Sequence, residues 1–309
     1  MPKPMPTAGK VAILFIVLTI WLPWVPANAY ESGAWLTTLT QHIPTRASHA
    51  LTGSQFVQRV SKMDEHQREE AIQEQLLEGN LPAFLRSLKP IYLQRRCDGG
   101  RLVHATIFVT PDYLAIGSQL DFIRVPMNFH TATRVATRFG CILPTRRMVD
   151  AIYNQSDYHF MPQPMTPGQQ MRSTAYYQRH NSKIKQQRLT HGIALGELVS
   201  GHKKDVVISN RLAERPGRIA IYGWHRPDGN PIQPLSTVHG AGYADYSHGI
   251  RLVSETVIVD GKACSVYDIL KDPELASLLT DEGPMAQLPR LLGVPAMSAS
   301  LHRWAPSVN

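Results

Sequence analysis

The polar residues best suited to chemistry gather between positions 202 and 251. Three strings in this stretch, GHKKDVVISN, IYGWHRPDGNPIQPL and VHGAGYADYSHGIRL, each place a histidine at the end of an expected strand or in a glycine-rich loop. Such positions are where a rigid scaffold presents functional groups. We therefore predict a catalytic centre built around His239, Asp245 and His248, with His225 and Asp205 in a supporting position.

Metal-assisted hydrolysis is one chemistry that these residues could perform. The spacing H-x5-D-x2-H offers His239, Asp245 and His248 as metal ligands, and His202 could complete or flank the set. A catalytic zinc ion needs three protein ligands and an open position for water. Zinc is therefore the expected cofactor under this hypothesis, although the spacing matches no established zinc signature.

Nucleophilic catalysis is a second possibility, and here the sequence resembles a known family. The string YGWH, followed by YSHGIRL, is similar to the catalytic stretch of L,D-transpeptidases of the YkuD type. The family has a cysteine between the glycine and the isoleucine of the second string, whereas Gly249 is followed directly by Ile250 here. The resemblance covers a short part of the chain and implies that His225 and His248 are pocket histidines and that Arg251 organises a carboxylate or the backbone.

A thiol from elsewhere in the chain could replace that missing nucleophile. Cys141 is expected at the start of a helix, where the helix dipole lowers a thiol pKa, and a histidine of the sheet could serve as its base. The alternative is that Cys141 is buried or forms a disulfide. With Cys97 and Cys264 the chain has three cysteines, and the sequence does not choose among their pairings.

Paired carboxylates acting on a glycosidic bond are the third chemistry. The acids in the region are Asp205, Asp228 and Asp245. Asp205 follows two lysines, which we expect to lower its pKa and to suit it to the role of a base. Asp228-Gly229 is more simply a turn between strands.

Several residues of the same region could hold a ligand. Lys203 and Lys204 could bind a substrate carboxylate, and aromatic and amide side chains pack on sugars and fix their orientation. The expected substrate-binding residues are Lys203, Lys204, Trp224, Gln233, Tyr243, Tyr246 and Arg251. The same set would serve a carbohydrate- or peptide-binding protein without catalysis, which is the alternative to an enzyme.

The elements that must position these residues indicate an α+β fold, in which a helical N-terminal half packs on a mostly antiparallel sheet formed by the C-terminal half. Helices are predicted over 64–78, 82–88, 131–140, 144–155, 170–192 and from 272, and strands over 102–110, 122–127, 205–209, 218–224, 250–259 and 263–267. Asp260-Gly261 predicts a hairpin between the last two strands. Alternation along 218–225 would place His225 with Ile219 and Ile221 on one face.

The first residues have the plan of a secretory signal. Lys3 and Lys10 precede an apolar run over 11–22, and the small residues 27–29 follow. An apolar run of about twelve residues is shorter than the ~20 that span a bilayer, so we expect cleavage before Tyr30 rather than an anchor. The mature protein would then be secreted or periplasmic, and its membrane contact would be limited to the signal peptide before cleavage.

We divide the chain into four parts: a signal peptide over 1–29, a mainly helical part with two or three strands over 30–160, a linker and basic helix over 161–192, and a β-rich part with the site over 193–309. The formal charge is +8, and removal of the two signal lysines leaves +6. A basic exported chain favours anionic envelope polymers or polysaccharides over nucleic acid as its partner. The sequence thus predicts an exported hydrolase of an envelope or extracellular polymer, such as a peptidoglycan peptide.

Overall fold

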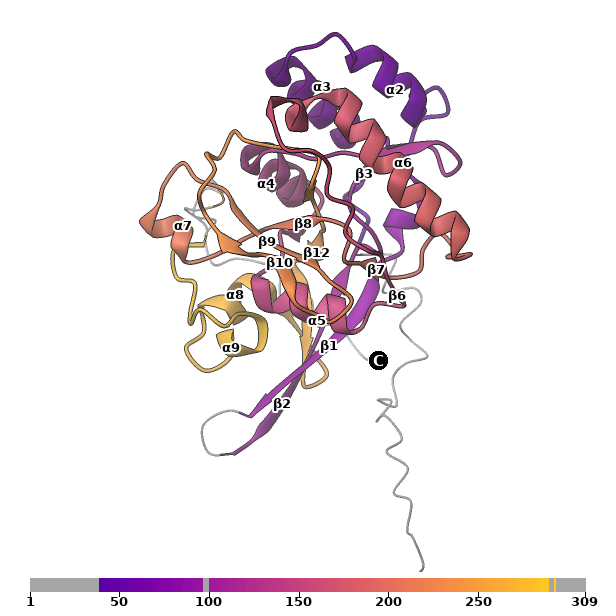
Figure 1. Cartoon of the computed structure of the whole chain (residues 1–309). Helices are drawn as coiled ribbons and strands as arrows, with labels where there is room; N and C mark the ends of the chain where they lie inside the picture. Colours follow the sequence, from indigo (N-terminus) through magenta and orange to yellow (C-terminus); the bar gives the residue numbers. More distant parts are fainter. Residues whose placement is uncertain (1–38, 97–99, 289–291, 293–309) are drawn as a thin grey trace, which may run out of the picture.

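The computed structural model describes residues 39–96, 100–288 and 292 (Figure 1). The predicted signal peptide and its cleavage position lie outside these ranges. Among the described residues, no helix is long and apolar enough to cross a membrane.

Short helices and short strands alternate along the chain. The helices are α2 Gly53–Val60, α3 Glu65–Leu77, α4 Phe129–Arg138, α5 Arg146–Asn154, α6 Thr174–Thr190, α7 Arg211–Glu214, α8 Val266–Lys271 and α9 Ala276–Leu279, with 3-10 turns η1 Ala83–Arg86 and η2 Gln169–Arg172. The strands are β1 Lys89–Arg96, β2 Leu102–Val109, β3 Ala115–Gly117, β4 Phe122–Arg124, β5 Cys141–Ile142, β6 Tyr158–His159, β7 Val199–Ser200, β8 Lys204–Val207, β9 Ala220–His225, β10 Pro231–Ser236, β11 His248–Gly249, β12 Val253–Ser254, β13 Thr256–Val259 and β14 Lys262–Ser265.

Helices α2, α3 and α6 gather at one end of the molecule (Figure 1). Helices α2 and α3 both begin with a capping box, in which Thr52 pairs with Gln55 and Asp64 pairs with Gln67. Each box satisfies two backbone N–H groups that the first helical turn leaves open. The predicted helix over 64–78 is thereby confirmed, with its start fixed by Asp64.

A six-stranded sheet forms the centre of the fold. Its order is β14-β13-β2-β12-β5, and β1 pairs with β2 outside this path. The predicted hairpin between β13 and β14 is confirmed, because Asp260 and Gly261 have φ values of +46° and +82°. Two successive positive φ values define the type I′ turn that suits the twist of a two-stranded hairpin.

A second sheet, in the order β10-β9-β8-β11, carries most of the residues predicted to be functional. Strands β8, β9 and β10 are antiparallel, whereas β11 runs parallel to β8 with His248 opposite Lys204. Helix α5 packs against β9. The two-stranded pairs β3–β4 and β6–β7 complete the described strands.

The α+β class is confirmed, with helices mostly in the N-terminal half and largely antiparallel sheets. The central sheet is nevertheless shared, because β1, β2 and β5 come from the first half of the chain and β12, β13 and β14 from the second. The proline-rich stretch after Tyr158 is mostly extended and is attached to the C-terminal part at Phe160 and Met165. Phe160 is buried, and its N–H donates to the Ser200 carbonyl.

Candidate functional site

The loop that precedes β11 is fixed by Asp245. Its Oδ1 accepts hydrogen bonds from the Ser247 N–H at 2.8 Å and from the Ser247 hydroxyl at 2.6 Å. The His248 N–H in turn donates to the Asp245 carbonyl at 3.0 Å. An aspartate that bonds the backbone two residues on makes an Asx turn, which holds the carboxylate in one orientation at the entrance of the strand.

His239 and Asp245 are joined through Tyr243. The rings of His239 and Tyr243 stack with centroids 4.1 Å apart, and the Tyr243 hydroxyl donates to Asp245 Oδ2 at 3.0 Å. Burial raises the pKa of Asp245, but nearby His248 and the two bonds from Ser247 outweigh it, and the pKa lies below its usual value. Asp245 is therefore an ionised group beneath a half-buried histidine–tyrosine pair.

His248 lies directly beside this assembly. Its ring packs edge-on against Tyr243 with centroids 5.7 Å apart, and the residue is 1% exposed. Burial lowers the pKa of His248 to about 4, although Asp245 favours its protonation. The imidazole is therefore neutral at pH 7, yet neither ring nitrogen has a hydrogen-bond partner among the described residues.

Lys204 and Trp224 form the remaining side of the site. The Lys204 ammonium lies 5.3 Å from the centroid of the Trp224 ring, and burial lowers the pKa of this half-buried lysine while Asp245 raises it. Trp224 has a φ of +55°, a conformation that costs a bulky residue on the order of 1 to 3 kcal/mol. Its buried Nε1 also lacks a partner within the described ranges. The strained backbone of Trp224 and the unpartnered nitrogens of Trp224 and His248 thus lie in the same site.

The structure therefore brings together His239, Asp245 and His248, the three residues at the centre of the sequence prediction. We call His239, Tyr243, Asp245, His248, Lys204 and Trp224 the Asp245 cluster.

His202, in contrast, belongs to a separate buried network, and Lys203 is buried as well. His202 Nε2 lies 3.0 Å from Asp112 Oδ1, and Asp112 also binds Arg124 and Arg188. The Lys203 ammonium donates to the Tyr246 carbonyl, and burial lowers its pKa to about 7. The prediction that Lys203 holds a substrate carboxylate is therefore corrected, because its side chain is buried and turned toward the protein interior.

The pKa of Asp205 also departs from the prediction. Burial raises it to about 6, and the neighbouring lysines are not what determines it. The Tyr113 hydroxyl donates to Asp205 Oδ2 at 2.8 Å, and Arg251 Nε lies 4.0 Å from Oδ1. Arg251 also donates to the carbonyls of Thr110 and Val199, so it organises the backbone in the interior and does not face a substrate.

His225 lies on the side of the sheet that faces α5. The predicted alternation fails here, because Tyr222 and His225 both contact Asp150 Oδ1, at 2.8 and 3.2 Å. The positive φ of Trp224 breaks the two-residue period and turns His225 toward the face that Tyr222 occupies. His225 and Asp205 are consequently not part of the Asp245 cluster.

Cys141 does not fit the role of a nucleophile. It lies in strand β5 rather than at a helix start, it is buried, and its thiol donates to the Phe139 carbonyl. Burial and nearby Glu255 raise the pKa of this thiol well above its usual value. Cys141 and Cys264 are both free, and Cys97 lies outside the described residues. Asp228 forms the predicted turn between β9 and β10, where it accepts from the Asn230 N–H.

The residues proposed as zinc ligands are engaged in other contacts. Both oxygens of Asp245 are engaged by Tyr243 and Ser247, and His202 is held by Asp112. No group of three or more His, Cys, Asp or Glu side chains within the described part of the chain is placed to hold a metal.

Among the other predicted binding residues, accessibility varies. Trp224 and Tyr246 are buried, so neither offers an open face for a sugar ring. The Tyr246 hydroxyl accepts from the Met165 N–H at 2.7 Å. Gln233 is half-buried, and its side-chain amide donates to the carbonyl of Pro234. Tyr243 and Lys204 remain as the predicted binding residues with access to solvent at the cluster.

Sequence reasoning missed the acids that hold the histidines. Asp112 follows β2 in the string TPDYL, a pattern that indicates only a turn, although its carboxylate receives His202 and two arginines. Asp150, on helix α5, receives His225 and Tyr222. Neither acid has a local spacing that links it to its partner, since 90 and 75 positions separate the pairs.

No family model matches the chain, and neither the curated proteins nor the solved structures gave a match.

Proposed function

We propose that this chain is an exported hydrolase that cleaves an amide bond in a cell-envelope or extracellular polymer, with a peptidoglycan peptide as the first substrate to test. The observation that carries the proposal is His248, a buried neutral imidazole whose two nitrogens have no partner among the described residues. Buried polar groups are normally hydrogen-bonded, and a catalytic role is one explanation for an exception. His180 also has two unpartnered ring nitrogens among the described residues, but the charged groups that act on it are basic, whereas His248 has Asp245 beside it.

The surrounding charges suit a hydrolytic step at this histidine. A nitrogen of His248 accepts a proton from water while the water oxygen attacks the amide carbon. The carbonyl oxygen then becomes an anion, which the Lys204 ammonium stabilises. The proton passes from His248 to the leaving nitrogen as the carbon–nitrogen bond breaks. Asp245 carries a fixed negative charge next to the imidazolium that forms in between, and it favours that charged state.

Substrate contact would fall to the exposed part of the cluster. His239 and Tyr243 are half-buried and stack on each other above Asp245. The basic composition of the chain and the signal-like first residues support an anionic polymer outside the cytoplasm as the substrate. No step of this mechanism passes through a metal ion.

The test compares purified wild-type protein with His248→Gln on isolated peptidoglycan sacculi, by quantifying newly released amino groups. We expect the substitution to lower the rate about 100-fold or more, because it removes the proton acceptor. His66→Gln is the matched control, since His66 is an exposed histidine on α3 and should keep the wild-type rate.

Two outcomes would contradict the proposal. Unchanged amine release by His248→Gln would exclude His248 from the chemistry. Sacculus binding by the wild-type protein without any release would favour the alternative, a carbohydrate- or peptide-binding envelope protein that has no turnover to lose.

A further inference from the structure

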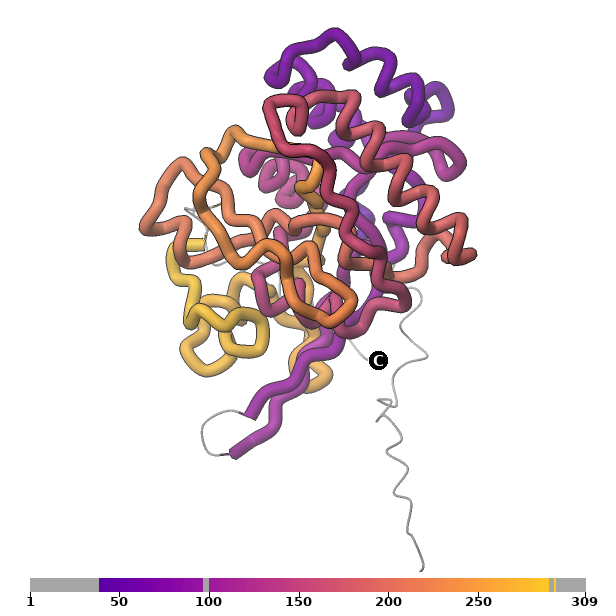
Figure 2. Tube along the Cα trace, viewed as in Figure 1, coloured from indigo at the N-terminus to yellow at the C-terminus, as the bar shows by residue number. Residues whose placement is uncertain are grey.

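The β1–β2 ribbon extends beyond the body of the molecule (Figure 2). Strand β1 pairs with β2 over eight residues, from Lys89 opposite Val109 to Arg96 opposite Leu102. On its other side β1 has no strand neighbour among the described residues. An open edge of this kind presents a row of backbone donors and acceptors that can pair with another chain.

The backbone bonds of His104 show which groups of β1 are open. The His104 N–H donates to Asp260 Oδ1 at 2.9 Å, and the Asp260 N–H donates to the His104 carbonyl at 3.0 Å. Since both groups of His104 point away from β1, its opposite residue Gln94 is in a non-hydrogen-bonded pair. The N–H and C=O of Gln94 therefore point outward, as do those of Arg96 two residues on.

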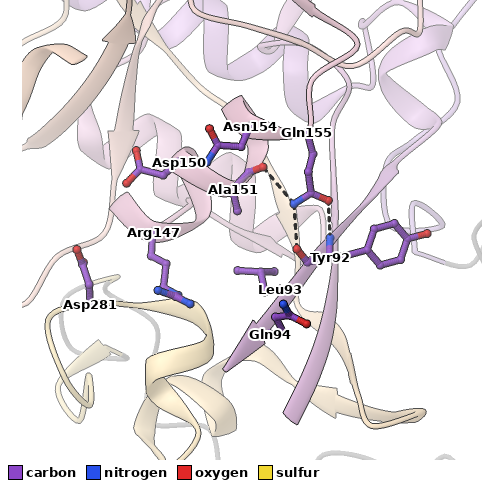
Figure 3. A pocket seen from close by; sticks show the side chains of 9 residues that line it. All are labelled: Tyr92, Leu93, Gln94, Arg147, Asp150, Ala151, Asn154, Gln155 and Asp281. Atoms are coloured by element: carbon purple, nitrogen blue, oxygen red, sulfur yellow. Dashed lines mark hydrogen bonds between the residues drawn. The ribbon is translucent and has the colours of Figure 1, made fainter. Parts of the chain in front are cut away.

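Pro90 and Tyr92 support this assignment. Pro90 lies four positions before Gln94, so its backbone groups point to the same side of the strand. A proline, which has no N–H, is tolerated where that group would face away from the ladder. At Tyr92 the outward groups are already bound. Gln155 Oε1 accepts from the Tyr92 N–H, and Gln155 Nε2 donates to the Tyr92 carbonyl, both at 2.9 Å (Figure 3).

The side-chain amide of Gln155 thus occupies the place that a peptide group of an added strand would take. Beyond it, Gln94 borders a cleft of about 330 Å³ between β1 and α5 (Figure 3). No hydrogen bond joins the outward groups of Gln94 to another described residue. Along the outer edge of β1, the backbone groups of Tyr92 are therefore already hydrogen-bonded, whereas those of Gln94 are available to a further strand.

The charge of the ribbon selects among possible occupants. Strand β1 carries Lys89, Arg95 and Arg96, and Arg101, immediately before β2, is paired with Asp260. The ranges Lys89–Arg96 and Leu102–Val109 contain no acidic residue. Opposite charges on facing strands stabilise pairing, and like charges oppose it. A second copy of the same basic strand is thus disfavoured, and an acidic strand is favoured.

We infer that the outer edge of β1 at Gln94 and Arg96 is a docking site for an extended acidic peptide, which adds to the sheet as a further strand. Its backbone would pair with the outward groups of Gln94, and its carboxylates would face Arg96. This site is separate from the Asp245 cluster, and the inference does not depend on the proposed hydrolysis.

The test uses Gln94→Pro, which deletes the outward N–H but no bond of the β1–β2 ladder. The matched control is Gln94→Ala, which keeps the N–H and loses only the side chain. The probe is a fluorescein-labelled eight-residue peptide of alternating Glu and Val, with a Lys and Val peptide of equal length for comparison. Fluorescence anisotropy measures Kd for each protein.

We expect the acidic peptide to bind the wild-type protein and Gln94→Ala with Kd values within about threefold of each other. Gln94→Pro should bind about tenfold more weakly, since one hydrogen bond is lost and the edge is blocked. N-methylation of alternate amides in the probe should abolish binding to the unaltered protein, so the result does not depend on how well the proline variant folds.

Three results would overturn the inference: no binding of the acidic peptide, equal binding of the lysine peptide, or equal binding of the N-methylated probe. A wild-type dimer that Gln94→Pro dissociates would assign the edge to self-association instead. Amine release from sacculi by Gln94→Pro reports on the Asp245 cluster separately, so failure of either proposal leaves the other measurable.

Discussion

Two buried histidines, His202 and His248, have the same exposure but opposite surroundings. Both are almost completely buried, and burial lowers the pKa of each to about 4. His202 Nε2 contacts Asp112, and Nδ1 lies 3.3 Å from the Ser200 carbonyl. His248 has no such partner in the described structure. The two histidines therefore do not differ in burial, and they differ in whether their ring nitrogens have partners.

The network around His202 is built for stability. Asp112 accepts from Arg124 Nε at 3.1 Å and lies 3.2 Å from Arg188 Nη2. Arg124 and His202 hold its pKa well below its usual value despite burial. The network joins β4, helix α6 and the segment before β8. The Asp245 cluster has a similar content of acid, histidine and cation, but its histidine His248 has no partner among the described residues, and His239 and Tyr243 are only half-buried.

Asp112→Asn is the strongest test of this contrast. The substitution leaves two buried guanidinium groups without their anion, which costs about 3 to 5 kcal/mol of the free energy of unfolding. Denaturant titration followed by tryptophan fluorescence measures the loss. Glu74→Gln is the control, because its pair with Arg59 is exposed and is worth less than about 1 kcal/mol. A loss below that control value for Asp112→Asn would break the comparison.

Acid sensitivity of the fold is the next expected effect, and both histidines should contribute to it. Because the pKa of His248 is lowered from about 6.5 to about 4, the unfolded chain binds a proton that the folded protein does not. Stability is therefore lost as the pH falls from 7 to 4, and this one histidine contributes about 3 kcal/mol of that loss. His248→Gln should flatten the pH profile of the free energy of unfolding by this amount.

His202→Gln sharpens the same measurement. It also removes a histidine with a pKa of about 4, but it breaks the contact with Asp112 and should lower stability already at pH 7. Equal stability of the two variants at pH 7 would show that the partners of His202 contribute nothing.

Local signals predicted most of the elements. The capping residue Asp64, the Asp260-Gly261 turn and the β-branched run of β2 each act within a few residues, and each led to the observed element. Strands β1 and β10 and the short pairings escaped prediction. Strand β5 forms only because Cys141 and Ile142 meet β12, more than a hundred positions away, so no local pattern marks it.

The candidate site was predictable in part for the same reason. His239, Asp245 and His248 lie within ten positions of one another, and one loop holds them together. The fates of His202 and His225 depended instead on the remote acids Asp112 and Asp150. Burial raises the pKa of Asp205, whereas the two adjacent lysines in the sequence led us to expect a lowered pKa.

Lys203 and Lys204 are adjacent in the sequence but have different surroundings. Lys203 is buried and bonded to the Tyr246 carbonyl, whereas Lys204 is half-buried beside Trp224 and Asp245. Lys204→Met keeps the aliphatic length and removes the charge that would stabilise the oxyanion. We expect kcat for amine release to fall about tenfold, with the free energy of unfolding within about 1 kcal/mol of wild type. Lys203→Met should instead alter stability, because it deletes a buried donor.

A Lys204→Met protein with full activity would remove this cation from the mechanism and leave His248 as its only tested part.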